Sequence, residues 1–257
     1  DFGRLARATA GTAPPPTGSL IPVKEQNFSY DIYGNLASLT TQTASPTTPT
    51  ATVTFVTAFA VNAQTNQLSG VCPGGVDRCL MGVYGPAGSG NQVGLAQSDE
   101  YTWDAFGMMT ELHSVRSERY VYDANDERIV TIDTLLSTEK QRRYTLRGPD
   151  NKVLRELTHT LSTNSWSPAK DYVYRGGALM ASFSSAFATE PDRHFHIDHL
   201  GSTRLVTDSN AQRLAVHTYW PFGQEAAGSE SDTERMKFTG HERDGAGHPS
   251  GFELDYM

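Results

Sequence analysis

The chain has 257 residues, enough for one large all-β domain or two smaller ones with a real hydrophobic core. It carries 21 basic and 29 acidic side chains, for a formal net charge of −8, and this charge argues against a nucleic-acid partner because phosphate binding needs a positive face. The hydrophobic fraction is only 37%, but aromatic residues at 10% argue against disorder and suit sheets with one face in water.

The first clear element is a short motif that recurs along the chain: an aromatic residue, Asp, two further residues, then Gly or Asp. The best copies begin at Tyr30, Trp103 and Tyr122, and weaker copies begin at residues 61, 84, 146 and 174. The spacing of 19 to 31 residues is about the length of one hairpin. We expect the aromatic head to end one strand, Asp with Gly or Asn to form the turn, and Leu or Ile to begin the returning strand. The repeat positions are Tyr30, Asp31, Gly34, Trp103, Asp104, Gly107, Tyr122, Asp123 and Tyr174.

The segments between these motifs have the composition of strands and loops. Residues 53–61 alternate, with Val53, Phe55 and Phe59 on one face. Residues 41–50 and the prolines at 14–16 predict loops, and no segment predicts a long amphipathic helix. No charged residue lies between Asp31 and Asp77, yet that stretch is too rich in Thr, Gln, Asn and Pro to span a membrane. We predict an all-β fold.

A single hairpin cannot bury its own apolar face, so stacked copies should share one sheet. Because strands twist, a long sheet of this kind should be curved or spiral and form a wall. The heads Tyr30, Trp103, Tyr122 and Tyr174 occupy equivalent positions, so we expect them to point to one side and to stack on their neighbours.

Cys72 and Cys79 lie close together in a Gly- and Pro-rich stretch. A local disulfide suits a secreted protein, but two free thiols fit the spacing equally well. A zinc site is not expected, because no histidine lies nearby to complete it.

The aromatic-Asp-x-x-Gly copies resemble YD repeats, and residues 194–208 resemble the start of the Rhs (rearrangement hotspot) repeat-associated core. Residues 219–225 and 238–244 follow in that family's order and approximate spacing. The matching core residues are His196, Asp198, His199, Leu200, Gly201, Ser202, Arg204, Pro221, Phe222, Gly223, Thr239, Gly240, Glu242, Arg243 and Asp244.

The resemblance implies a YD-repeat shell segment at residues 1–190, with a polar loop or insertion at about 41–99, and an incomplete core at 191–257. In similar proteins the repeats form a hollow β-shell around a C-terminal toxin. We therefore expect a non-enzymatic wall segment of a secreted or cell-surface bacterial polymorphic toxin, without a cofactor. Its expected partners are the rest of its own shell and a toxin or other cargo polypeptide. The alternative is an adhesion or carbohydrate-binding module that uses Trp103, Trp166 and Trp220.

Three groups of polar residues invite a chemical interpretation. His194, His196 and Asp198 would share one face of a strand and are potential metal ligands, but they match the core signature and could instead hold the turn at Gly201.

Ser202 with His199 and Asp198 suggests a catalytic triad, yet adjacent residues on a strand point to opposite faces. An ion pair among Asp198, Arg204 and Asp208 would pin this hairpin.

The charged run from His241 to Asp244 is typical of a solvated or salt-bridged turn.

Overall fold

The computed structural model describes residues 3–9, 23–44, 52–73, 80–85, 90–95, 99–113, 116–135, 138–184, 192–226, 229, 232, 234–244 and 254–256. In this described part the regular structure is antiparallel β-strand, apart from one short 3-10 helix at Phe238–Gly240, which confirms the all-β prediction. The chain forms two compact units, Asp1–Asp99 with Thr218–Ser229 and Glu100–His217 with Glu230–Met257. They are units 1 and 2 below.

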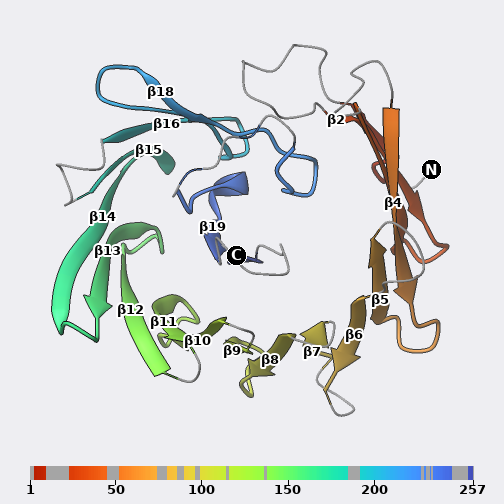
Figure 1. Ribbon diagram of the computed structural model, residues 1–257, viewed down its shortest axis with the longest axis horizontal. Helices are drawn as coiled ribbons and strands as arrows, with labels where there is room; N and C mark the ends of the chain where they lie inside the picture. The colour runs from red at the N-terminus through yellow and green to blue at the C-terminus, as the bar shows by residue number, and fades with distance from the viewer. Residues whose placement is uncertain are drawn as a thin grey trace. The chain divides into compact units, whose positions relative to one another are not determined.

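Unit 1 is a meander in which each strand that the structure describes pairs with the next (Figure 1). Its strands are β1 (Arg7–Thr9), β2 (Val23–Tyr30), β3 (Leu36–Ala44), β4 (Thr52–Val61), β5 (Leu68–Pro73), β6 (Leu80–Tyr84) and β7 (Gln92–Leu95). Strands β4 to β7 lie within residues 41–99, where we expected a polar loop or insertion, so the described part of this stretch contains strands of the sheet. The expected division into segments 1–190 and 191–257 stays a prediction.

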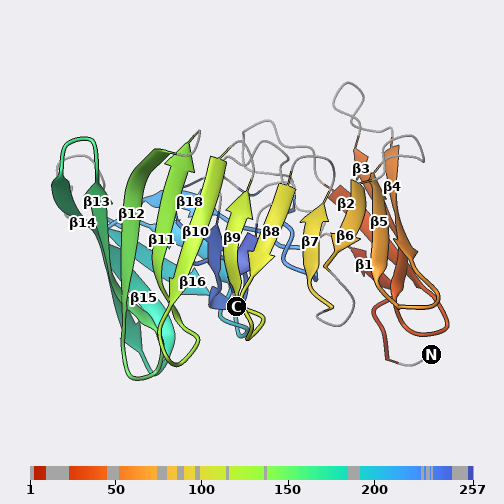
Figure 2. The same cartoon turned by 90° about the horizontal axis from the view of Figure 1, so that it is seen from below.

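Unit 2 has the same pattern of antiparallel hairpins, and Figure 2 shows strands β8 to β14 side by side. Its strands are β8 (Asp99–Trp103), β9 (Met109–His113), β10 (Arg116–Tyr122), β11 (Arg128–Leu135), β12 (Thr138–Arg147), β13 (Val153–Thr160), β14 (Ser165–Arg175), β15 (Ala178–Phe183), β16 (Arg193–Ile197), β17 (Thr203–Thr207), β18 (Arg213–Val216), β19 (Glu242–Asp244) and β20 (Leu254–Tyr256). Strands β10 to β18 bend around β19 (Figure 1). We call the side of this sheet that faces β19 its inner face.

The repeat motif forms the hairpin turns as predicted. Strands β2, β8 and β10 end at the heads Tyr30, Trp103 and Tyr122. In the turn after β10, one carboxylate oxygen of Asp123 accepts hydrogen bonds from the backbone N–H groups two and four residues on, at 2.8 and 3.0 Å. The carboxylates of Asp31, Asp104, Asp198 and Asp208 make the same pair of bonds.

The fourth residue of each of these turns has a positive φ, which explains the Gly or Asp of the motif. Gly107 has φ 84° and Asp126 has φ 63°. Glycine adopts this left-handed conformation without steric cost, and Asp and Asn tolerate it better than other residues. The pairing register shifts beside the head residue, as between Val121 and Tyr122, because the returning strand β11 carries one extra residue there. Such a bulge increases the local twist at the strand end that carries the aromatic head.

The tyrosine heads connect each hairpin to the one before it. The hydroxyl group of Tyr122 donates to the carbonyl oxygen of Met109 at 2.7 Å, and that of Tyr30 donates to the carbonyl oxygen of Leu5 at 2.8 Å. Both rings are half-buried. Stacking of the heads along the sheet stays a prediction.

The core of unit 2 lies on the inner face of its sheet. It consists of Val153, Tyr172, Leu179, Phe195, Val206, Ala215 and Met236. All but Met236 come from strands β13 to β18, and Met236 comes from the segment that precedes β19. The sheet therefore completes its core with a segment from the C-terminal part of the chain.

Cys72 lies buried on β5 and is disulfide-bonded. Cys79 lies outside the described residues, so the pairing of these two cysteines stays a prediction.

Replacing Tyr122 by Phe should remove the bond to the Met109 carbonyl and keep the ring. We expect the free energy of unfolding to fall by about 1 kcal/mol, the usual net value of one hydrogen bond. Amides of β9 and β10 should exchange with solvent faster than those of distant strands. Tyr33→Phe is the control, because the Tyr33 side chain is exposed in a turn and its loss of a hydroxyl should change neither quantity. Faster exchange spread evenly over the chain would contradict the prediction.

Candidate functional site

The site is the junction between the inner face of unit 2 and the inner segment, by which we mean residues 232 and 234–244. Strand β17 and the residue before it make the first set of contacts in this junction. The backbone N–H of Thr203 donates to the carbonyl oxygen of Lys237 at 3.1 Å, and its hydroxyl donates to the carbonyl oxygen of Met236 at 2.8 Å. The hydroxyl oxygen of Ser202 accepts from the backbone N–H of Thr239 at 2.9 Å. Ser202 and Thr203 are completely buried, so they hold the inner segment without access to water.

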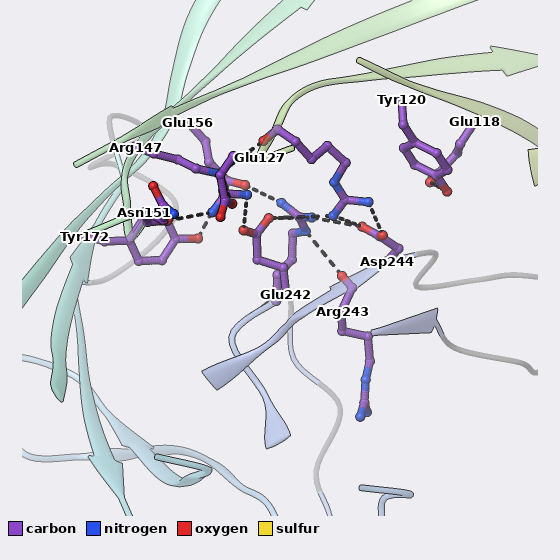
Figure 3. Close-up of polar contacts among 12 residues, drawn as sticks. Glu118, Tyr120, Glu127, Arg147, Asn151, Glu156, Tyr172, Glu242, Arg243 and Asp244 are labelled. Carbon is purple, nitrogen blue, oxygen red and sulfur yellow. Dashed lines mark hydrogen bonds and ion pairs between the residues drawn. The ribbon is translucent and has the colours of Figure 1, made fainter. Parts of the chain in front are cut away.

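Arg235 of the inner segment is at the centre of a buried ion-pair cluster. Figure 3 shows its partners Glu156, Glu242 and Asp244. Its guanidinium group donates to a carboxylate oxygen of Glu156 on β13 and, at 2.9 Å, to Asp244 on β19. It also lies 3.3 Å from Glu242. Glu156 in turn accepts a hydrogen bond from the hydroxyl of Tyr172 at 3.0 Å. One arginine thus joins the wall to both acidic residues of β19.

Two arginines of the sheet bind the same acidic residues from the other side. Arg128 on β11 donates to both carboxylate oxygens of Asp244, one of them at 3.0 Å, and Arg147 on β12 donates to Glu242 at 2.6 Å. The partners are 116 and 95 residues apart in the chain. The contact of Arg128 with both oxygens of Asp244 is bidentate, and a bidentate arginine–carboxylate contact fixes the orientation of the two side chains as well as their distance.

A second cluster holds the beginning of the inner segment. Glu234 accepts from Lys170 on β14 at 2.7 Å and from Arg193 on β16 at 2.9 Å. Asp232 accepts from Lys237 and lies 3.2 Å from Nε2 of the buried His217.

The two clusters share a charge pattern. The wall supplies mainly cations, at Arg128, Arg147, Lys170 and Arg193, and the inner segment supplies mainly carboxylates, at Asp232, Glu234, Glu242 and Asp244. The pair of Arg235 with Glu156 has the opposite polarity. A buried charge without its partner is costly, so a shift of the inner segment along the wall would break several pairs at once. The network therefore specifies one register.

The surroundings keep these groups charged. Burial would lower the pKa of Arg235, but the carboxylates of Glu156, Asp244 and Glu242 outweigh it and raise that pKa above its usual value. Burial would likewise raise the pKa of Glu156, but the nearby arginines 235 and 143 hold it below its usual value. Arg235 and Glu156 are thus a charged pair at neutral pH.

The pKa of the Asp232 carboxyl lies well below its usual value. Burial would raise its pKa, yet hydrogen bonds from His217 and Lys237 and the charge of Lys237 lower it to about 2. This carboxylate therefore remains ionised, and paired, in moderately acidic solution.

A cleft of about 430 Å³ lies beside the network in unit 2. Its floor includes Val153, Leu179 and Met236, and Lys152 and His241 are among its polar lining residues. Wall and inner segment both line it, so it forms part of the same junction.

The proposed metal ligands are not brought together. His194 and His196 are exposed on β16, whereas Phe195 between them is buried in the core. The carboxylate of Asp198 caps its turn and binds Arg204 at 2.8 Å, and His196 lies 3.2 Å from the hydroxyl of Thr207. Within the described ranges, no group of three or more His, Cys, Asp and Glu side chains is arranged to hold a metal ion.

The triad interpretation is wrong in this structure. Ser202 is buried and contacts Thr239, whereas His199 is exposed and Asp198 serves its turn. The predicted ion pair of Asp198 with Arg204 is present. Asp208 instead caps the turn between β17 and β18.

The prediction for the charged run from His241 to Asp244, a solvated or salt-bridged turn, was only partly right. Glu242, Arg243 and Asp244 are buried and form strand β19, so the expectation of a solvated turn was wrong, and salt bridging is what the structure contains. The remaining charged members of the two clusters were not expected from the sequence: Arg128, Arg147, Glu156, Lys170, Arg193, Asp232, Glu234 and Arg235. Their partners are distant in the chain, and no local pattern marks a charged strand residue that faces inward.

The three tryptophans differ in environment. Trp220 is buried and Trp103 is half-buried, whereas Trp166 is exposed and stacked on His159 at a ring distance of 4.4 Å.

Comparison with solved structures identifies the fold. The crystal structure of TcdB2-TccC3-Cdc42 matches with a TM-score of 0.54 and 17% identity over 86% of this chain. A mutant TccC3 form of the Photorhabdus luminescens Tc holotoxin pore matches with a TM-score of 0.51 and 17% identity over the same share, and TcdB2-TccC3 without its hypervariable C-terminal region with 0.52 and 14%. This chain spans 13% of the length of each of those chains.

No protein-family model matches the chain, and no curated protein matches it in sequence. The structural likeness confirms, at the level of the fold, the all-β architecture of antiparallel hairpins that the motifs predicted. Among the described residues, no helix is long and apolar enough to cross a membrane.

Replacing Arg235 by Ala should leave Glu156 and Asp244 buried beside an empty position. Removal of one partner from a buried ion pair typically costs about 3–5 kcal/mol, and we expect a loss of this size in the free energy of unfolding. Arg155→Ala is the matched control, because Arg155 pairs with Asp171 on β14 in water-exposed positions, and such pairs contribute about 0–1 kcal/mol. Urea unfolding of both variants measures the difference. Equal losses would show that the network does not hold the junction.

The Asp232 carboxylate should make stability depend on pH in a defined window. Its pKa is about 2 in the folded protein and about 3.9 in an unfolded chain, so its contribution is complete above about pH 4 and is lost as the pH falls through 2. We expect Asp232→Asn to be less stable than the wild type at pH 6, and this difference should shrink between about pH 4 and pH 2. Thermal unfolding across this range tests the sign. A difference that stays constant down to pH 2 would contradict the pairing.

Proposed function

We propose that this chain is a wall segment of a β-shell that houses a toxic or other cargo polypeptide. The matched proteins are described as TcdB2-TccC3 complexes and as a Tc holotoxin pore, and one of the complexes is described as being without its hypervariable C-terminal region. The chain shares their fold over 86% of its length, which supports a corresponding role. We infer from the same likeness a secreted bacterial protein whose partners are the rest of its shell and its cargo.

The observation that carries the proposal is the buried network between wall and inner segment. A sheet that served only as a surface would have no need to bind a strand of its own chain on its inner face. Here the cations of β11, β12, β14 and β16 hold the acidic inner segment in one register. The wall thus carries a polypeptide on its inner face.

The chain itself is proposed to be non-enzymatic. The polar residues with catalytic chemistry that the sequence offered are engaged in turns and in the junction, as for Asp198 and Ser202. Any catalytic activity would belong to the cargo.

Adhesion or carbohydrate binding is less well supported. Sugar stacking requires exposed aromatic faces. Of the three tryptophans named for this alternative, Trp220 is buried, Trp103 is half-buried, and Trp166 is exposed with one face stacked on His159.

The test is limited proteolysis of the full-length protein that contains this chain. We expect the segment downstream of the shell to resist protease in the folded protein and to be cut rapidly as a free polypeptide. Arg235→Ala should make that segment more accessible because it loosens the inner strand, whereas Arg155→Ala on the outer face should not. A downstream segment as sensitive as the free polypeptide would show that the shell houses no cargo.

A further inference from the structure

The cleft of unit 2 contains apolar side chains that remain partly in water. Leu200, in the turn after β16, is 57% exposed, and Tyr174 and Ile197 are half-buried. Beneath them lies the buried core of unit 2. The cleft volume of about 430 Å³ falls in the range of about 300–1,000 Å³ that is typical of ligand sites. These side chains gain in free energy when an apolar group covers them.

The cleft also contains a cation that forms no ion pair with a described residue. The ammonium group of Lys152 lies 5.6 Å from the centre of the Tyr174 ring, and no carboxylate in the described part of the chain is bound to it. Arg147, which lines the same cleft, is instead bound to Glu242 at 2.6 Å. A polypeptide in the cleft would therefore meet apolar surface and a donor for a carboxylate or a backbone carbonyl group.

Strand β20 directs the chain toward this cleft. It pairs antiparallel with β19, and Tyr256 lies opposite Glu242, which lines the cleft. Opposite residues of such a pair have their Cα atoms about 5 Å apart, so the backbone at residue 256 is already beside the cleft. Because the pairing is antiparallel, β20 runs toward residues 240 and 241, which line the cleft too. A Cβ atom on Gly240 would lie 3.7 Å from the carbonyl oxygen of Gly201, so this path leads to the turn after β16.

We propose that the residues directly after Met257 in the full-length protein occupy this cleft, with an apolar side chain against Leu200 and a backbone carbonyl or carboxylate group at Lys152. This deepens the proposed function and rests on it, because it needs the downstream segment that the shell would house. The occupant follows from the direction of β20. The cleft then anchors the wall end of the segment that leads to the cargo.

Crosslinking in the folded full-length protein tests the proposal at two matched positions. The residue directly after Met257 is replaced by Cys, together with either Leu200→Cys or Asn210→Cys. Residues 200 and 210 each follow a capping aspartate by two positions, but their turns lie at opposite edges of the unit 2 sheet.

We expect a short bis-maleimide to join the added cysteine to residue 200 at least about tenfold faster than to residue 210, because neighbouring thiols have a high effective concentration. In urea the two rates should be similar. Peptide mass spectrometry identifies the joined residues and separates them from the native cysteines.

Equal rates in the folded protein would overturn the proposed contact. Crosslinks that join two molecules would identify a second copy as the occupant and would also overturn it. Protease resistance of the segment further downstream, measured on the same samples, reports separately on the proposed function. A resistant segment without the crosslink at residue 200 would refute only the anchor in the cleft. The crosslink together with a protease-sensitive segment would support the anchor and refute the housing of a cargo.

Discussion

In five of the hairpin turns, one Asp carboxylate oxygen accepts hydrogen bonds from two backbone N–H groups and so closes the turn, and the sheet depends on these turns. At Asp123 these bonds define a turn whose fourth residue, Asp126, must have a positive φ. A bulge lies beside this turn, where the register shifts between Val121 and Tyr122, and the hydroxyl of Tyr122 at this strand end donates to the Met109 carbonyl oxygen. A local side-chain interaction thereby becomes a contact between successive hairpins, and its repetition builds the wall.

The inner face of the wall carries buried cations that the hairpin turns do not neutralise. Cations on β11, β12, β14 and β16 face inward, and buried cations are tolerated only when they are paired. The acidic inner segment supplies the partners. Buried ion pairs contribute little net stability compared with apolar packing, but they penalise every misaligned arrangement. Met236 provides apolar packing in the same segment, and the charges decide its register.

The fold was largely predictable because its signals are local. The motif at residues 122–126 contains its own turn cap, its positive-φ position and its strand end, and the structure has all three there. The junction was not predictable, because Arg128 and its partner Asp244 are 116 residues apart in the chain. The residues around each of them also look like those around a charged side chain that lies in water. The run at 242–244 was misjudged for the same reason: charge density usually means exposure, and here the compensating charges come from distant strands.

The ion pairs of the inner segment and the apolar contacts of the sheet differ in how their side chains behave before the chain folds. An acidic segment such as 242–244 is soluble when unpaired, so it can remain in water until the wall has formed and then dock through charge pairing. The apolar core residues of β13 to β18, such as Phe195 and Val206, gain from burial as soon as these strands pair. Apolar packing and ionic pairing therefore favour an order of assembly in which the strands of the sheet pair first and the inner segment docks onto the wall they form.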